Sequence, residues 1–205
     1  MVATPRLFAV VVATSFAAGL NIYATVATLG LLARAGVVPL PGSLEILSSW
    51  TVIGAAVTLY LVEFVADKIP AIDLAWNALQ TFVRVPVAAL LAYGASTQLS
   101  LSEQLLTAAL ASAIALVAHG GKTAARIAVT PSPEPYSNMA LSFGEDVLAV
   151  YMTWLGTSHP LVAMVIALVL IALIVVFIHS VVRAFRSVMR GGLRQVQLRS
   201  DSVRQ

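Results

Sequence analysis

The most constraining feature of the sequence is a series of long apolar runs, of which the last is the clearest. Residues 161–182 read LVAMVIALVLIALIVVFIHSVV, and only His179 and Ser180 interrupt the apolar character. A helix needs about 20 mainly apolar residues to cross the hydrocarbon core of a bilayer. Six segments approach this length and are predicted helices: Leu7–Leu32, Trp50–Ala66, Trp76–Gly94, Glu103–Ala118, Ser137–Leu155 and Leu161–Val182.

The composition agrees with a membrane protein. Of the 205 residues, 60% are hydrophobic and 10% are charged, whereas soluble domains are about 25% charged. The absence of cysteine excludes disulfides, cysteine-ligated zinc and iron–sulfur clusters. We predict an all-α polytopic membrane protein with about six transmembrane helices, folded as one domain over residues 1–190. A basic tail, residues 191–205, is expected to be mobile.

Glycine, asparagine and proline predict where these helices break. The sequence Gly19-Leu20-Asn21 interrupts the first apolar run near its middle, so we expect a broken first helix. That run is too long for a cleaved signal peptide and is expected to remain as a helix. Three prolines within residues 131–135 exclude a continuous helix there and predict a stiff loop on the cytoplasmic side, of a kind that can be re-entrant.

The distribution of basic residues predicts the orientation of the chain in the membrane. With six spans, both termini lie on one side, which then collects Arg6, Lys68, Lys122, Arg126 and the six arginines of residues 183–205. The opposite side holds Arg34, Glu45 and Glu103. Cytoplasmic loops carry an excess of lysine and arginine. We therefore expect a multi-pass protein of the bacterial inner membrane with both termini in the cytoplasm.

The stretch from His119 to Asp146 concentrates polar residues between two apolar runs. Gly120-Gly121 are expected to end the fourth helix, leaving Lys122 and Arg126 beside a glycine-rich turn. Such a group suits a phosphate or a lipid headgroup. His119 is either a hydrogen-bonded interior residue or a proton carrier. Downstream, Asn138 can cap the fifth helix, and the Glu134 carboxylate can pair with Lys122 or Arg126.

Charges also occur inside the predicted helices. Arg84 lies eight residues into the third helix, and Glu145 and Asp146 lie at a similar depth in the fifth. At 1.5 Å per residue, this depth is on the order of 12 Å. A charge there costs about 3 kcal/mol and has to be paired or hydrated. We expect Arg84 to pair with Glu145 or Asp146, either fixing helix packing or forming a gate or ion-coupling site.

Two further groups are candidates for binding. Glu63 and Asp67 are four residues apart on one helix face, followed by Asp73, and form either a helix end at the surface or a carboxylate pair for a proton or cation. Asn21 and Tyr23 stand at the break in the first helix. This break either builds a binding site in the middle of the membrane or forms a helix–helix contact.

The polar motifs together resemble a known family. GLNIY at 19–23, EFVADKIP at 63–70, HGGKTAAR at 119–126, SPEPYSN at 132–138 and SFGED at 142–146 are similar to those of the domain of unknown function 4126 family. The resemblance covers about residues 10–180. It implies a small bacterial-type integral membrane protein, and it implies no activity, cofactor or partner.

We predict a small transporter- or channel-like protein whose charged centre serves ions, protons or a small anionic solute of unknown identity. The alternatives are a protein that handles lipid headgroups, or a structural or accessory membrane subunit. No enzyme motif is present, no cofactor is expected and the metal content is open. The expected partners are membrane lipids and, in a homo-oligomer, further copies of the chain. Nucleic acid is not expected, because the basic residues do not form a folded basic face. The candidate site residues are Asn21, Tyr23, Glu63, Asp67, Asp73, Arg84, His119, Lys122, Arg126, Glu134, Asn138, Glu145 and Asp146.

Overall fold

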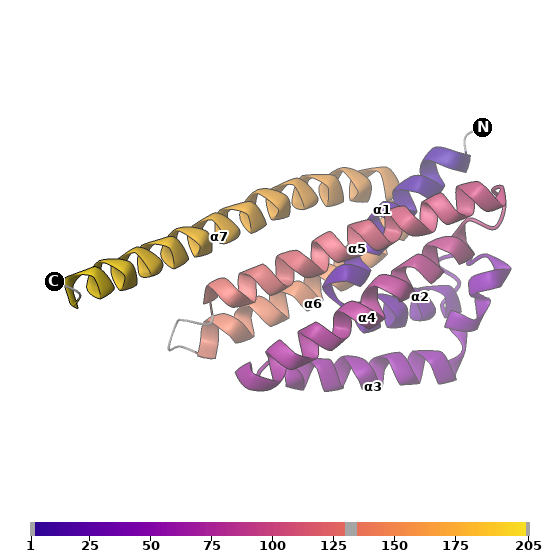
Figure 1. Cartoon of the computed structure of the whole chain (residues 1–205). Helices are drawn as coiled ribbons and strands as arrows, with labels where there is room; N and C mark the ends of the chain where they lie inside the picture. The colour runs from indigo at the N-terminus through magenta and orange to yellow at the C-terminus, as the bar shows by residue number, and fades with distance from the viewer. Residues whose placement is uncertain (1–2, 130–134, 204–205) are drawn as a thin grey trace.

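Helices make up all the regular structure of the described residues. The computed structural model describes residues 3–129 and 135–203, with some side chains near helix ends and after residue 187 left out. The elements are α1 (Ala3–Leu20), α2 (Ile22–Arg34), the short 3-10 helix η1 (Gly42–Ser48), α3 (Trp50–Ala66), α4 (Pro70–Ala95), α5 (Leu101–Val129), α6 (Pro135–Ser158) and α7 (Pro160–Val203). The all-α prediction is confirmed for these ranges, and the bundle is shown in Figure 1.

Helix α1 lies at the centre of the bundle. Its residues from Val11 to Leu20 are all buried, and it packs against α4, α5, α6 and α7. A helix buried on all sides needs no polar face, which explains why AVVVATSFAAGL has no amphipathic pattern. Alanines such as Ala13 and Ala17 allow close approach between helices, while Phe16 fills the core between them.

The first apolar run turns back at Asn21 instead of continuing across the bundle. Residues from the first half of α1, including Arg6 and Val10, line the same cavity as Leu29 of α2. Helices α1 and α2 therefore form a hairpin whose tip is the buried Asn21. The break predicted at Gly19–Asn21 is confirmed, and both arms of the hairpin extend to the same end of the bundle.

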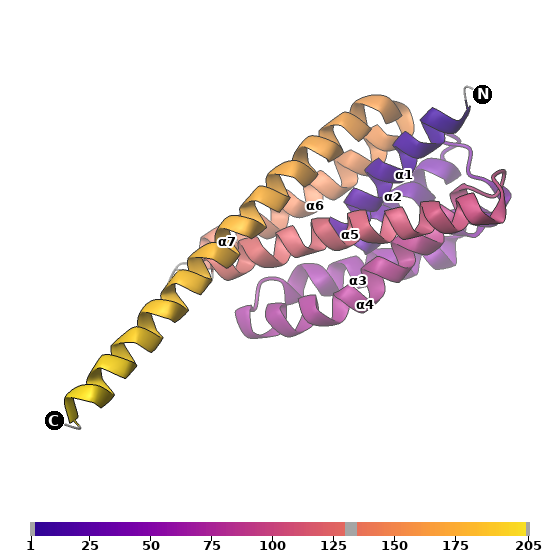
Figure 2. The same ribbon diagram turned by 45° about the horizontal axis from the view of Figure 1, so that its top comes forward.

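Two ends of the bundle follow from this arrangement. The N-terminal end holds the start of α1 and the α4–α5 and α6–α7 turns, whereas the C-terminal end holds the α3–α4 turn and the last turns of α5 (Figures 1 and 2). The two chain termini lie at opposite ends (Figure 2). This follows from the α1–α2 hairpin, which begins and ends at the same end of the bundle. The expectation that both termini lie on one side of the membrane stays a prediction.

The six predicted spans are not confirmed. Three described segments are long and apolar enough to cross a membrane: Ala75–Ala95, Leu101–Ala128 and Pro160–Ser187. A fourth is added if η1 and α3, which are bent by 63°, count as one span. The arms of the hairpin, Pro5–Leu20 and Ile22–Arg34, are shorter apolar helices. The protein is thus a helical membrane protein with three to four candidate spans.

Two helix ends differ from their predicted places. Helix α5 continues through Gly120-Gly121 to Val129, although the glycine pair was expected to end it near Ala118. A Cβ at Gly121 would lie 2.6 Å from Ile174 Cγ2, so this glycine permits close packing against α7. Helix α7 continues as far as Val203 and includes residues 191–203 of the predicted basic tail. The proline loop before Pro135 falls outside the described residues.

Candidate functional site

The tip of the α1–α2 hairpin forms one wall of the site. Asn21 has an extended backbone, and its Oδ1 accepts a hydrogen bond from the amide of Ala24 at 2.9 Å, which caps α2. Its Nδ2 donates to Asp146 Oδ1 of α6 at 2.8 Å. A single buried asparagine therefore both starts α2 and connects the hairpin to α6.

Four other helices turn polar stripes toward this tip. Residues spaced three, four and seven apart lie on one face of a helix. The stripes are Tyr60, Glu63 and Asp67 on α3 and its C-cap, Asn77, Gln80, Thr81 and Arg84 on α4, His119, Lys122 and Arg126 on α5, and Ser142, Glu145 and Asp146 on α6. The helical periodicity brings residues far apart in sequence into one buried region.

Six of these side chains form what we call the buried ion-pair network: Glu63, Asp67, Arg84, Lys122, Arg126 and Glu145. Arg84 Nη2 pairs with Glu63 Oε1, and both side chains are fully buried. Lys122 Nζ lies 3.2 Å from Glu63 Oε1 and 2.8 Å from Asp67 Oδ2. Lys122 thus connects both carboxylates of α3 to α5.

The network continues toward the C-terminal end of the bundle through Arg126. Its Nη2 lies 3.1 Å from Asp67 Oδ2 and 3.2 Å from Glu145 Oε2. Glu145 Oε2 is also 3.5 Å from Lys122 Nζ. Three carboxylates therefore face three bases, and their formal charges cancel. A buried charge is tolerated when it is paired in this way.

Asp67 lies just after the apolar segment of α3, which ends at Ala66. Burial raises the pKa of its carboxyl, but Lys122 and Arg126 lower it by more, so that the pKa lies below that of an ordinary aspartate. The ionised carboxylate therefore stabilises the fold at neutral pH. This stabilisation is lost as the pH falls through the lowered pKa of the folded state.

The ionic state of His119 follows from its partners. Arg84 Nη1 approaches His119 Nδ1 at 2.9 Å, and because a guanidinium only donates, Nδ1 is the acceptor. The proton is then on Nε2, which lies 3.0 Å from the carbonyl oxygen of Asn77. His119 is thus a neutral, hydrogen-bonded interior residue that holds Arg84 in place. Arg84 Nη1 also donates to the carbonyl of Gly19 at 3.1 Å.

Asp146 stands apart from the ion-pair network. Its side chain is buried, with Asn21 on one oxygen and the Tyr60 hydroxyl 3.5 Å from the other. Within the described part of the chain, no base forms a salt bridge with it. Asp146 is therefore a buried carboxylate outside the salt bridges of the described residues. Removing a carboxylate from water favours its uptake of a proton or a cation.

A groove of about 370 Å³ gives access to Asp146. It lies between α3 and α6, and Phe143 and Val147 on its wall are exposed. The remaining wall consists of Tyr60, Val150, Tyr151 and Trp154. The groove connects Asp146, but none of the six network residues, with the outer surface of the bundle.

Several predicted site residues come together, but two predicted contacts are wrong. Arg84 pairs with Glu63 rather than with Glu145 or Asp146. The hairpin tip lies between Arg84 and Asp146, since the Gly19 carbonyl accepts a hydrogen bond from Arg84 while the Asn21 amide donates one to Asp146. The predicted glycine turn near Lys122 is continuous helix, so its amides do not form an anion site.

Other predicted residues lie apart from the network or outside the description. The Tyr23 hydroxyl accepts a hydrogen bond from Gln80 Nε2 at 3.1 Å and does not reach the network. Asp73 and Asn138 are described without side chains, and Glu134 falls between the two described ranges. Within those ranges, no group of three or more acids and histidines is arranged to hold a metal ion.

Sequence reasoning missed the uncharged members of the polar stripes. Ser142 Oγ donates to Asp67 Oδ2 at 3.3 Å, and Thr81 Oγ1 lies 2.9 Å from His119 Nε2. Tyr60, Asn77 and Gln80 were also overlooked. Their spacing of three, four and seven residues from Glu63 or Arg84 was the available signal. Uncharged polar residues are common in membrane helices, so this signal is evident mainly after the charged residues have been placed.

Asn21 offers a test of the hairpin tip. Asn21→Ala is expected to lower the free energy of unfolding by about 1 kcal/mol more than Asn21→Ser, because serine retains an N-cap acceptor. Both variants lose the amide that donates to Asp146. Equilibrium unfolding in mixed detergent micelles measures the difference. Equal stability of the two variants would show that the cap at Asn21 contributes nothing.

Comparison with known proteins places the chain in a family without a known role. The family model described as a domain of unknown function, DUF4126, matches residues 8–180 and thus includes the whole site. No curated protein matches the chain, and no solved structure does. The chain therefore belongs to the DUF4126 family of domains of unknown function.

Proposed function

We propose that the protein is a small proton- or cation-transporting membrane protein in which Asp146 binds the transported ion. The observation that carries this proposal is the charge balance of the site. Among the described residues, the six charges of the ion-pair network balance, and Asp146 is a buried carboxylate that forms no salt bridge there and accepts hydrogen bonds from Asn21 and Tyr60. A carboxylate of this kind in a membrane helix is a candidate for ion handling.

The network itself serves as the rigid support of this site. Its members connect α3, α4, α5 and α6 through paired, buried charges. Within the described structure, the second carboxylate oxygens of Glu63 and Asp67, Oε2 and Oδ1, are buried without a hydrogen-bond donor. Arg84 and Lys122 hold their carboxylate partners in salt bridges, whereas the Asp146 carboxylate is left to exchange its ion.

Other predicted functions have less support. Each buried base already lies within 4 Å of a carboxylate, which opposes binding of an anionic solute or a lipid headgroup at Lys122 and Arg126. A structural role would account for the network and for the hydrogen bond between Asn21 and Asp146, but it gives no reason for the open groove beside this carboxylate. The proposed transport of a proton or cation accounts for both.

We further propose a plasma-membrane location with the C-terminal end of the bundle in the cytoplasm. The α3–α4 turn, which contains Lys68, and the last turns of α5, which contain Lys122 and Arg126, lie at this end, as does the arginine-rich end of α7. Cytoplasmic ends of membrane proteins are enriched in such residues. Because the groove at Asp146 is open on one side, a second copy of the chain would complete the path for the ion.

Reconstitution into liposomes tests the proposal. Proton, sodium and potassium fluxes are measured with ion-sensitive dyes for the wild type, Asp146→Asn and Glu45→Gln. Glu45 is an exposed acid of η1, so its variant makes the same change of charge outside the site. Asparagine has the shape of aspartate and keeps an acceptor for Asn21.

The expected result is a flux of one ion above that of empty liposomes, at least about tenfold lower in Asp146→Asn and unchanged in Glu45→Gln. A tenfold change corresponds to about 1.4 kcal/mol. An unchanged flux in Asp146→Asn would show that Asp146 is not the ion site. The absence of all three fluxes in the wild type would leave a structural role as the better account.

A further inference from the structure

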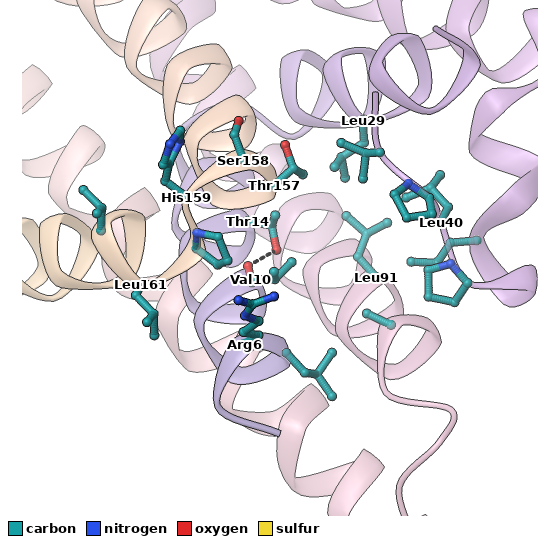
Figure 3. A pocket seen from close by; sticks show the side chains of 18 residues that line it. Arg6, Val10, Thr14, Leu29, Leu40, Leu91, Thr157, Ser158, His159 and Leu161 are labelled. Carbon is teal, nitrogen blue, oxygen red and sulfur yellow. Dashed lines mark hydrogen bonds between the residues drawn. The ribbon is translucent and has the colours of Figure 1, made fainter. Parts of the chain in front are cut away.

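A cavity of about 600 Å³ lies at the N-terminal end of the bundle, away from Asp146. It lies among α1, the segment before η1, the end of α4 and the α6–α7 turn (Figure 3). A volume of this size is typical of small-molecule sites, which measure about 300–1,000 Å³. None of the residues of the proposed ion site lines this cavity.

The wall of this cavity is mainly apolar. Figure 3 shows Leu29, Leu40 and Leu91 together on one side. Pro39, Pro41 and Leu44 extend this surface along the segment that leads into η1. Side chains of this kind suit a hydrocarbon chain, because burying apolar surface is favourable by about 25 cal/mol per Å².

The polar groups of the cavity lie on the other side in Figure 3. Arg6 is at the start of α1, and His159 is in the turn between α6 and α7. Thr157 and Ser158 precede His159 at the end of α6, and their hydroxyls donate to the carbonyl of Trp154 at 2.8 and 2.5 Å. These two hydroxyls are thus used by the helix end, and Arg6 remains as the charged donor.

The charge of the lining is purely basic. No Asp or Glu is among the residues that line the cavity, and Arg6 has no acidic partner within the described chain. An exposed guanidinium has donors for a phosphate, which it binds with two parallel hydrogen bonds. The occupant therefore combines an apolar chain with an anionic head.

We propose that this cavity binds an anionic phospholipid, with an acyl chain against Leu29, Leu40 and Leu91 and the phosphate at Arg6. The position agrees with this occupant, because Arg6 and His159 lie at helix ends at one end of the bundle, where headgroups lie beside a membrane protein. The site is separate from Asp146, and it does not depend on the proposed ion transport.

Native mass spectrometry of the detergent-purified protein tests the proposal. The probes are phosphatidylglycerol, phosphatidylcholine and glycerol phosphate. The variants are Arg6→Gln and, as a matched control, Arg34→Gln. Arg34 is exposed near the end of α2, lies 4.3 Å from the ring centroid of Trp50 and does not line the cavity. A third variant, Leu161→Trp, adds bulk to an exposed residue on the cavity wall.

The expected result is saturable binding of phosphatidylglycerol to the wild type and to Arg34→Gln. We expect it to be weakened about tenfold in Arg6→Gln, the change expected for one lost charge-assisted hydrogen bond. Leu161→Trp is expected to weaken binding as well, and glycerol phosphate is expected not to compete. Equal binding of phosphatidylcholine, unchanged binding to Arg6→Gln or displacement by glycerol phosphate would each overturn the proposal.

Discussion

Replacing Arg84 with alanine is expected to lower the free energy of unfolding by about 3–5 kcal/mol, the range for removing one partner of a buried ion pair. The variant leaves Glu63 buried, with Lys122 as its one remaining salt-bridge partner among the described residues. It also removes the donors to Gly19 and His119, so that two further acceptors lose their partner. The effect is expected to exceed that of any exposed substitution.

Equilibrium unfolding in mixed detergent micelles measures this effect. Arg34→Ala is the control, because it removes an arginine that is exposed and stacked on Trp50. A contact of this kind contributes about 0.5–1 kcal/mol. Equal destabilisation by Arg84→Ala and Arg34→Ala would show that the ion-pair network does not support the fold.

A double variant separates charge from packing. Arg84→Met combined with Glu63→Gln removes both charges and keeps much of the side-chain volume. Uncharged residues of similar volume often replace a buried ion pair without loss of stability. We therefore expect the double variant to be less destabilised than the sum of the two single variants. A strictly additive result would contradict direct coupling between Arg84 and Glu63.

Gly19→Ala is expected to destabilise the protein by about 1–3 kcal/mol, the usual cost of overpacking a core. An added Cβ would lie 2.5 Å from the carbonyl oxygen of Ala115 and 2.7 Å from Ala118 Cβ. Neither atom is at the end of a flexible side chain, so α1 and α5 have to separate. The Gly19 carbonyl that accepts from Arg84 would move with α1.

The control for this prediction is Gly54→Ala, which is expected to raise the stability of the protein instead of lowering it. Gly54 is inside α3, and an added Cβ there meets no atom within 4 Å. Alanine is more stable than glycine within a helix by about 0.5–1 kcal/mol, so Gly54→Ala is expected to be stabilising. Thermal unfolding in detergent compares the two variants. A stabilising Gly19→Ala would show that α1 and α5 are not in close contact at this point.

Much of the candidate site could be predicted from local sequence. The four-residue spacing of Glu63 and Asp67 and the same spacing of Lys122 and Arg126 place each pair on one helix face. Asn21 was recognisable because a polar residue after glycine interrupts an apolar run. The partner of Arg84 was not predictable, because several acids lie at a similar depth and only the packing of the helices selects Glu63.

The sequence by itself determined that the chain is helical, belongs in a membrane, breaks at Asn21 and carries buried charges that have to be paired. These properties depend on residue type and on spacing along one helix. Only the tertiary structure decided that α1 and α2 form a hairpin, that three acids and three bases neutralise one another and that Asp146 is left over. The reason is that the direction of a chain after a break, and the choice among several possible ion pairs, depend on contacts between helices that are distant in sequence.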